Sequence, residues 1–322
     1  MIDEREVANA AGLITGAREA VVLGHQHPDG DSIGSVLAMA MMLDARGIRV
    51  QASWPDPFAV PSKYSYLPGT DLLVRPSDVR PAELVVALDC ANLERLEDFK
   101  RLVTGAGVVN VDHHPDNPGF GDANLVDQTA AATAEIIYIC SRELGLVVEL
   151  DPARCLYTGL VTDTGRFQFT NTSPETFRVA SEMVALGVRP VEVYDNVYQG
   201  DSLAYMRLTG EVLSRAEFDE GLGLVYAGVT REELRARGIG MDETEDLIDS
   251  IRTLKGHRIA ALFKEQEDGR IRVSLRSRPD VDIGKVARAL GGGGHKVAAG
   301  YTSRERSVEG AVEELKGALG AI

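Results

Sequence analysis

The sequence has few cysteines and no long apolar run, and each shortage excludes a class of protein. Only three cysteines occur in 322 residues, and Cys90, Cys140 and Cys155 form no CxxC pair. They are too sparse for a disulfide framework and are typical of a reducing compartment. The apolar stretch 33–43 is well short of the ~20 residues that a transmembrane helix needs. The first residues predict an acidic helix rather than a basic leader, so we expect a cytoplasmic protein with no membrane partner.

Basic residues are also scarce, with 34 lysines and arginines against 49 acidic residues and a net charge of −15. This balance disfavours binding to a long nucleic-acid duplex. The charge is unevenly distributed, however, because residues 251–306 contain 13 basic and only 6 acidic residues. A basic segment in an otherwise acidic chain predicts a local site for an anion.

Hydrophobic residues are plentiful, at 44% of the chain, and their pattern predicts an α/β fold. Three short β-branched runs, at 20–24, 84–88 and 107–111, are typical of strands buried on both faces. Helical segments are predicted at 31–45, 131–144 and 151–163. The alternation favours a mostly parallel sheet with helices on both of its faces.

The pattern changes in the last third of the chain, which indicates a second domain. Helical segments at 174–186 and about 191–213 are followed by strand-like runs at 222–229, 258–264 and 270–276 and by a helix at 283–290. We therefore predict three parts: an N-terminal domain at 1–195, a helical connector at 196–215, and a smaller C-terminal α/β domain at 216–322.

Side chains that can bind metals follow the predicted strands directly. His25 comes after the first strand, Asp89 after the second, and Asp112, His113 and His114 after the third. Ligands of open α/β sheets bind beyond the carboxyl ends of the strands. Asp29, Asp31 and Asp163 are further carboxylates in the same segments. If these acids converge, a cation is the simple way to hold them together without large pKa shifts.

The donor types indicate which metal the site would bind. Carboxylates suit Mg²⁺ and Mn²⁺, while imidazoles favour transition metals, so the mixture favours Mn²⁺ over Co²⁺, Fe²⁺ or Mg²⁺. The donors are numerous enough for two divalent ions. Two ions that share one carboxylate can stabilise an in-line phosphoryl displacement.

A glycine-rich motif, GGGGHKVAAG, occupies residues 291–300 near the end of the chain. Consecutive glycines permit close backbone approach to a ligand, and their amides can surround an anion. Arg276 and Arg278 precede the motif, and guanidinium groups suit phosphate oxygens. A flexible linker is the alternative interpretation of such a glycine run.

Taken together, these motifs resemble the DHH phosphoesterase superfamily, in its branch with a GGGGH-type DHH-associated C-terminal domain. The matching pieces are HQHPDGD at 25–31, LD at 88–89, DHH at 112–114, GLVTDTGRFQFTNT at 159–172 and GGGGHKVAAG at 291–300. They occur in the family's order and cover nearly the whole chain. Their layout is similar to bacterial NrnA-like nano-RNases and 3′-phosphoadenosine 5′-phosphate phosphatases.

The resemblance implies a role for each matching residue. His25 and Asp29 would bind one metal, Asp31, His113 and Asp163 would bind the other, and Asp89 would bridge them. Asp112 would orient a neighbouring histidine, and His114 would contact the scissile phosphate. The substrate-binding residues implied in the C-terminal domain are Arg276, Gly292, Gly293, Gly294 and His295. His27 fills a variable position and is expected to be a solvated loop residue.

The expected activity is hydrolysis of short oligonucleotides and of 3′-phosphoadenosine 5′-phosphate to mononucleotides. A related alternative is a phosphodiesterase of cyclic or linear dinucleotide messengers such as cyclic di-AMP or pApA. Two alternatives from other classes are a nucleotide sensor without catalysis and a structural α/β protein that binds no metal. The expected partners are short single-stranded RNA or DNA. Members of the family are often dimeric, so the resemblance also implies a possible homodimer.

Overall fold

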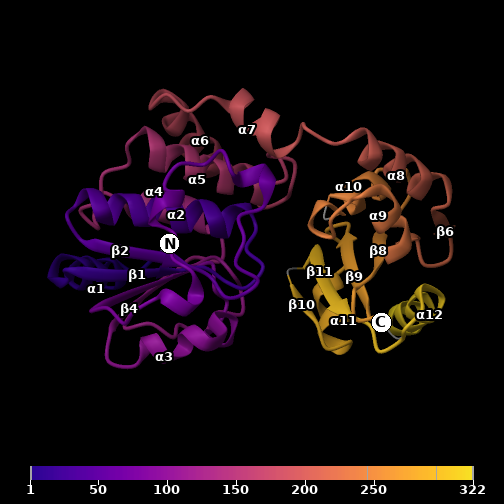
Figure 1. The fold of residues 1–322 in the computed structure, drawn as a ribbon, viewed down its shortest axis with the longest axis horizontal. Helices are drawn as coiled ribbons and strands as arrows, with labels where there is room; N and C mark the ends of the chain where they lie inside the picture. Colours follow the sequence, from indigo (N-terminus) through magenta and orange to yellow (C-terminus); the bar gives the residue numbers. More distant parts are fainter. Residues whose placement is uncertain (1, 245, 295, 321–322) are drawn as a thin grey trace. The chain divides into compact units, whose positions relative to one another are not determined.

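The chain folds into two compact units, residues 1–200 and 201–322. The computed structural model describes residues 2–244, 246–294 and 296–320. Each unit has a sheet of its own (Figure 1). Each also has its own hydrophobic clusters. The α/β class predicted from the sequence is therefore confirmed.

The first unit is built on a five-stranded sheet in which all paired strands are parallel. The strands are β1 (Glu19–Leu23), β2 (Arg49–Ser53), β3 (Leu84–Leu88), β4 (Gly107–Asp112) and β5 (Ala123–Val126). Their order across the sheet is β2-β1-β3-β4-β5. The chain changes direction across the sheet between β1 and β3, and such a switch point is where ligands of open α/β sheets bind.

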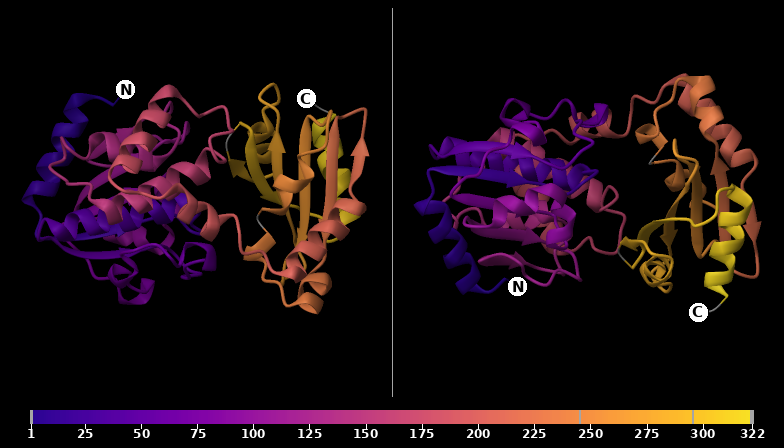
Figure 2. Two further views of the ribbon diagram at one scale, coloured as in Figure 1. Left: turned by 90° about the horizontal axis from the view of Figure 1, so that it is seen from above. Right: turned by 60° about the horizontal axis from the view of Figure 1, so that its bottom comes forward.

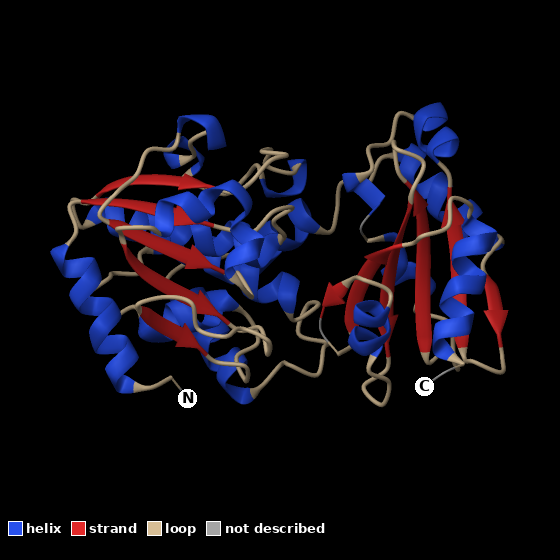
Figure 3. Ribbon diagram, turned by 90° about the horizontal axis from the view of Figure 1, so that it is seen from below, coloured by secondary structure: helices blue, strands red, loops and turns tan. Residues whose placement is uncertain are grey.

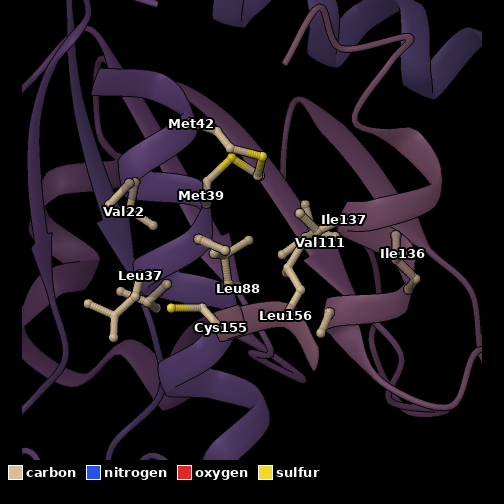
Figure 4. Close-up of a cluster of buried hydrophobic side chains, with 14 of the residues drawn as sticks. Val22, Leu37, Met39, Met42, Leu88, Val111, Ile136, Ile137, Cys155 and Leu156 are labelled. Atoms are coloured by element: carbon tan, nitrogen blue, oxygen red, sulfur yellow. The ribbon is translucent and has the colours of Figure 1, made fainter. Parts of the chain in front are cut away.

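The three strands predicted from apolar runs are buried on both faces of this sheet. Val22, Leu88 and Val111 face the larger cluster, where they pack with residues of the neighbouring helices (Figure 4). Their neighbours Val21 and Val85 belong to a second cluster on the opposite face. A strand covered on both sides needs an uninterrupted apolar run, which explains why β1, β3 and β4 were recognisable in the sequence.

Helices cover both faces of this sheet (Figure 3). They are α1 (Glu4–Gly16), α2 (Gly30–Ala45), α3 (Lys100–Val103), α4 (Thr133–Cys140), α5 (Leu150–Asp163), α6 (Pro174–Ala185) and α7 (Pro190–Val197). Short 3₁₀ turns lie at η1 (Ser62–Tyr64), η2 (Thr70–Leu72), η3 (Pro76–Asp78) and η4 (Leu93–Phe99). α4 is shorter at both ends than the helix predicted at 131–144.

Helices α2 and α5 approach each other through glycines. A Cβ atom at Gly34 of α2 would lie 2.3 Å from the backbone carbonyl oxygen of Cys155 in α5. A Cβ atom at Gly159 of α5 would lie 2.8 Å from a carboxylate oxygen of Asp31 in α2. Neither position has room for a side chain, so the two helices pack with their backbones nearly in contact.

The second unit has a six-stranded mixed sheet of order β10-β11-β9-β8-β7-β6, in which only the β7–β8 pair is parallel. Its strands are β6 (Glu217–Asp219), β7 (Leu224–Val229), β8 (Ile259–Glu265), β9 (Ile271–Ser277), β10 (Gly293–Gly294) and β11 (Ala298–Thr302). Its helices are α8 (Leu203–Ser214), α9 (Arg231–Arg237), α10 (Leu247–Ile251), α11 (Ile283–Ala289) and α12 (Val308–Leu319), with a 3₁₀ turn η5 (Asp242–Thr244). α11 and α12 pack on one face, and α8, α9 and α10 on the other (Figure 2).

The single helix predicted at about 191–213 is wrong, because the chain breaks it into α7 and α8. Gly200 lies between them with φ = 122°, a value that no helix accommodates. Leu208 and Val212 of α8 are fully buried in the second unit with Val225 of β7. The segment predicted as a connector, 196–215, thus contains the end of α7 and a helix that belongs to the second core.

No helix in the described ranges is long and apolar enough to cross a membrane. Cys90, Cys140 and Cys155 are all buried, and none of them forms a disulfide. The interpretation of the cysteines as small buried apolar residues is confirmed.

The close approach of α2 and α5 generates a stability prediction. We expect Gly34→Ala to lower the free energy of unfolding by about 1–3 kcal/mol, the usual cost of overpacking, because the backbone carbonyl of Cys155 cannot move aside independently. Gly12→Ala is the matched control, since Gly12 lies in α1 with no atom within 4 Å of its added Cβ. That change should stabilise the protein by about 0.5–1 kcal/mol. Urea unfolding of both variants measures the difference, and equal effects would contradict this packing.

Candidate metal centre

The predicted metal-binding side chains converge at the carboxyl end of the first unit's sheet. His25 follows β1 after one glycine, Asp89 follows β3 directly, and Asp112 is the last residue of β4. Asp29 is the N-cap of α2, and Asp163 is the last residue of α5. Two helix ends and three strand ends therefore supply donors to one edge of the sheet.

A first group of donors consists of His25, Asp29 and Asp89, with one possible ligand atom of each lying within 4.8 Å of the others. His25 Nε2 lies 3.4 Å from Asp89 Oδ2. The other ring nitrogen, Nδ1, is 2.7 Å from the carbonyl oxygen of Gln26. Since a carbonyl can only accept, Nδ1 is protonated, and Nε2 is the nitrogen that faces the group.

A second group consists of Asp31, His113 and Asp163, again with ligand atoms within 4.8 Å of one another. His113 Nε2 lies 3.4 Å from Asp163 Oδ2 and 3.7 Å from Asp89 Oδ1. Asp89, His113 and His114 form a third grouping of the same kind. Asp89 therefore touches both sets of donors, one through each carboxylate oxygen.

Asp89 is held in an unusual conformation and environment. Its φ is +58°, in the left-handed region that aspartate enters more easily than most residues. The residue is only 2% exposed. Burial favours the neutral carboxyl, but the hydrogen bond to His25 and the charges of His114, His25 and His113 outweigh burial and hold the pKa of Asp89 well below its usual value. This carboxylate therefore remains charged inside the protein.

Asp31 shows the opposite shift. Burial, together with the negative charges of Asp89 and Asp29, raises the pKa of Asp31 well above its usual value. The amides of Thr133 and Ala134, the first residues of α4, donate to its two oxygens at 2.7 and 3.0 Å and partly offset this effect. Three carboxylates are thus crowded around one point, and only part of their repulsion is compensated by protein groups.

Asp112 and His114 form a hydrogen-bonded pair beside this cluster. His114 Nδ1 donates to Asp112 Oδ1 at 2.8 Å, and the Asn117 side-chain amide donates to Asp112 Oδ2 at 2.6 Å. Burial disfavours the charged imidazole, but the bond to Asp112 and the charges of Asp89, Asp112 and Asp29 raise the pKa of His114 to about 9. Asp112 therefore orients and charges the histidine that follows it by two residues.

The donor arrangement fits divalent cations. Each carboxylate oxygen has about two lone pairs, so the backbone bonds to Asp31 leave it able to ligate an ion. Three acids within one cluster are stable together when a cation neutralises them. The acidic and imidazole groups at this edge could therefore bind metal, as the sequence predicted.

Two polar residues at this edge escaped the sequence reasoning. Asn117 lies three residues after DHH and holds Asp112, so its proximity to the motif was a usable signal. Thr133 donates its hydroxyl to Asp89 Oδ1 at 3.2 Å, although 44 residues separate them. No sequence pattern pointed to Thr133, because only the fold brings α4 beside β3. His27 is exposed, as expected of a loop residue.

The predicted substrate-binding residues of the second unit lie on β9, on β10 and beside β10. Arg276 is half-buried on β9. Gly293 and Gly294 form the short strand β10, so part of the glycine run is an edge strand rather than the loop expected. A Cβ atom at Gly292 would lie 2.5 Å from Cβ of Tyr301, whereas one at Gly293 would meet nothing within 4 Å. His295 lies outside the described residues.

Comparisons with known proteins agree with this geometry. The family model described as the DHH family, N-terminal domain, matches residues 19–160, and the DHHA1 domain matches residues 223–321. A bifunctional oligoribonuclease and PAP phosphatase NrnA of Thermus thermophilus is 36% identical over 293 residues, which cover 90% of this chain and 86% of that protein. The protein of the same name from Bacillus subtilis is 30% identical over 284 residues, 86% of each chain.

The fold also matches a solved structure across both units. The crystal structure of an exopolyphosphatase-related protein from Bacteroides fragilis superposes with a TM-score of 0.92 at 24% identity. The match covers 100% of this chain and 97% of that one. With two domain models in the expected order and relatives at up to 36% identity over most of their length, the chain belongs to the DHH family and carries a DHHA1 domain.

Proposed function

We propose that this protein is a metal-dependent phosphoesterase that hydrolyses short oligonucleotides and 3′-phosphoadenosine 5′-phosphate to mononucleotides. The observation that carries the proposal is the sharing of Asp89 between two groups of metal donors. The relatives named as bifunctional oligoribonucleases and PAP phosphatases, which match this chain over most of their length, support the substrate class.

The donors divide naturally between two divalent ions. We assign His25 and Asp29 to one ion, and we assign Asp89 to both. The second ion takes Asp31, His113 and Asp163. Three donors for the first ion and four for the second, mixing imidazoles with carboxylates and sharing Asp89, suit Mn²⁺ better than an all-carboxylate site would. When bound, two such ions supply Lewis-acid charge and activate water as a nucleophile at neutral pH.

The chain's own residues then position the phosphate and its charge. Asp112 fixes the ring of His114 through Nδ1, and we assign the opposite nitrogen, Nε2, to a non-bridging oxygen of the scissile phosphate. A cationic imidazole there stabilises the charge that develops on the phosphoryl oxygens in the transition state. Asn117 keeps Asp112 in place by donating to its other oxygen.

We assign the first unit to catalysis and the second to holding the rest of the substrate. Residues 251–306 carry the chain's local excess of basic charge, and Arg276 and the amides around Gly293 lie within this segment. The remaining chain is strongly acidic and would repel a long strand, so short substrates are favoured. Three buried cysteines without a disulfide support a cytoplasmic location.

The first prediction from this assignment concerns substrate length. With Mn²⁺ present, we expect di- to pentanucleotides and 3′-phosphoadenosine 5′-phosphate to be hydrolysed much faster than a strand many times longer. Chelation should stop all turnover, and Mg²⁺ should support it less well. Product analysis over a length series, with pApA and cyclic di-AMP beside it, measures the preference. Selective turnover of the dinucleotides would favour the messenger phosphodiesterase instead.

The second prediction concerns Asp89. Asp89→Asn keeps the side-chain shape but removes the charge shared by both donor groups, so Mn²⁺ binding and turnover should both be lost. Loss of one group that stabilises the transition state lowers kcat by about 10²–10³-fold. We expect the fall in kcat of Asp89→Asn to be at least that large. Asp44→Asn is the matched control, because Asp44 is an exposed residue at the far end of α2. Calorimetric titration with Mn²⁺ and steady-state kinetics test both variants, and undiminished turnover by Asp89→Asn would exclude this active site.

The third prediction concerns the second unit. Arg276→Ala should raise KM for a dinucleotide by about 10-fold or more, the loss of one charge-assisted phosphate contact. Mn²⁺ binding should be unchanged, because Arg276 is not a metal donor. Arg270→Ala is the control, since Arg270 directly precedes β9 and pairs with Asp268 in the hairpin turn. If both variants have the wild-type KM, the phosphate contact lies elsewhere.

A further inference from the structure

Thr133 is a buried residue that contacts two of the candidate metal ligands at once. It is the first residue of α4 and has no exposed surface. Its backbone amide donates to Asp31 Oδ2 at 2.7 Å, and its hydroxyl donates to Asp89 Oδ1 at 3.2 Å. It therefore links a carboxylate of the second donor group to the carboxylate that both groups share.

The hydroxyl bond acts on the oxygen of Asp89 that faces the second group. Asp89 Oδ1 lies 3.7 Å from His113 Nε2, while Oδ2 lies 3.4 Å from His25 Nε2. Asp89 has φ = +58°, a strained backbone conformation that persists only where the surrounding contacts hold it. A donor on Oδ1 fixes the rotation of the carboxylate plane, and with it the direction of both oxygens.

The hydrogen bond from the Thr133 backbone amide to Asp31 holds the residue, and with it the hydroxyl, in a fixed position. The first two amides of α4 hold both oxygens of Asp31, and Gly159 of α5 leaves just enough space for that carboxylate. The position of Thr133 is thus set by backbone hydrogen bonds and helix packing. Removing the hydroxyl alone would leave these backbone contacts in place.

We propose that Thr133 is a positioning residue whose hydroxyl orients the shared carboxylate of Asp89 and thereby sets the affinity of the site for divalent cations. The inference rests on the proposed function, because it takes Asp89 as a metal ligand. Removing a hydrogen-bond partner of a metal ligand typically lowers metal affinity by about 10–100-fold. We expect a loss of about that size here.

The test is Mn²⁺ binding measured by calorimetric titration of the full-length protein. Thr133→Val keeps the shape and removes the donor, so its dissociation constant for Mn²⁺ should rise by about 10–100-fold. Thr133→Ser retains the hydroxyl and should bind nearly as the wild type does. Turnover by Thr133→Val should recover as the Mn²⁺ concentration is raised to saturation. If the valine variant fails to fold, Thr133→Ala takes its place in the test. It also lacks the hydroxyl but adds no apolar surface, and it should show the same loss of Mn²⁺ affinity.

Urea unfolding of the metal-free variants separates positioning from general structural support. A purely structural role would lower the free energy of unfolding of Thr133→Val without changing its Mn²⁺ affinity, and that result would overturn the inference. The Asp89→Asn variant distinguishes failure of the role proposed for Thr133 from failure of the metal centre itself. If it loses Mn²⁺ binding while Thr133→Val and Thr133→Ala do not, only the role of Thr133 fails. If Asp89→Asn binds Mn²⁺ normally, the proposed metal centre fails as well.

Discussion

Mutual repulsion among Asp29, Asp31 and Asp89 is the constraint around which the first unit is organised. Burial and neighbouring negative charges raise the pKa of Asp31, whereas burial of Asp89 is outweighed by the surrounding histidines, which lower its pKa. These two acids therefore have distinct environments. Neighbouring like charges are unfavourable unless donors or cations compensate them. The imidazoles and the α4 amides supply part of that compensation, and divalent cations complete it in the proposed enzyme.

Holding such a cluster requires rigid support, and most of it comes from the backbone. Parallel strands β1, β3 and β4 end together at one edge, which brings residues from distant parts of the sequence to one place. The close packing of α2 on α5 through Gly34 and Gly159 fixes the helix that carries Asp31. The amino terminus of α4 then binds the same carboxylate through two amides. The stability of the first unit and the position of Asp31 in the proposed metal centre thus depend on the same contacts.

The glycines at 292–294 in the second unit differ in what they do: some are required by the local fold, and one leaves its backbone open to a ligand. Gly292 is pressed against the backbone of β11, and Gly294 has φ = 128°, so both are needed for the local fold. An added Cβ at Gly293 meets open space, which makes this residue the one of the three whose backbone a ligand could approach. A run of identical residues in the sequence therefore contains two different physical requirements.

Sequence alone determined the fold class, the family and the candidate ligands, because buried parallel strands need continuous apolar runs and end in short, ordered motifs such as DHH at 112–114. The break between α7 and α8 was missed because both segments have helical periodicity, although Gly200 and the N-cap Ser202 between them were usable signals. Packing of Leu208 and Val212 then assigns α8 to the second core. The sequence could not reveal Thr133, which has no motif of its own. The family resemblance implied that Asp89 is shared, but tertiary structure alone decided the contacts that surround it, because contacts between residues far apart in the chain depend on strand order and helix packing, not on local pattern.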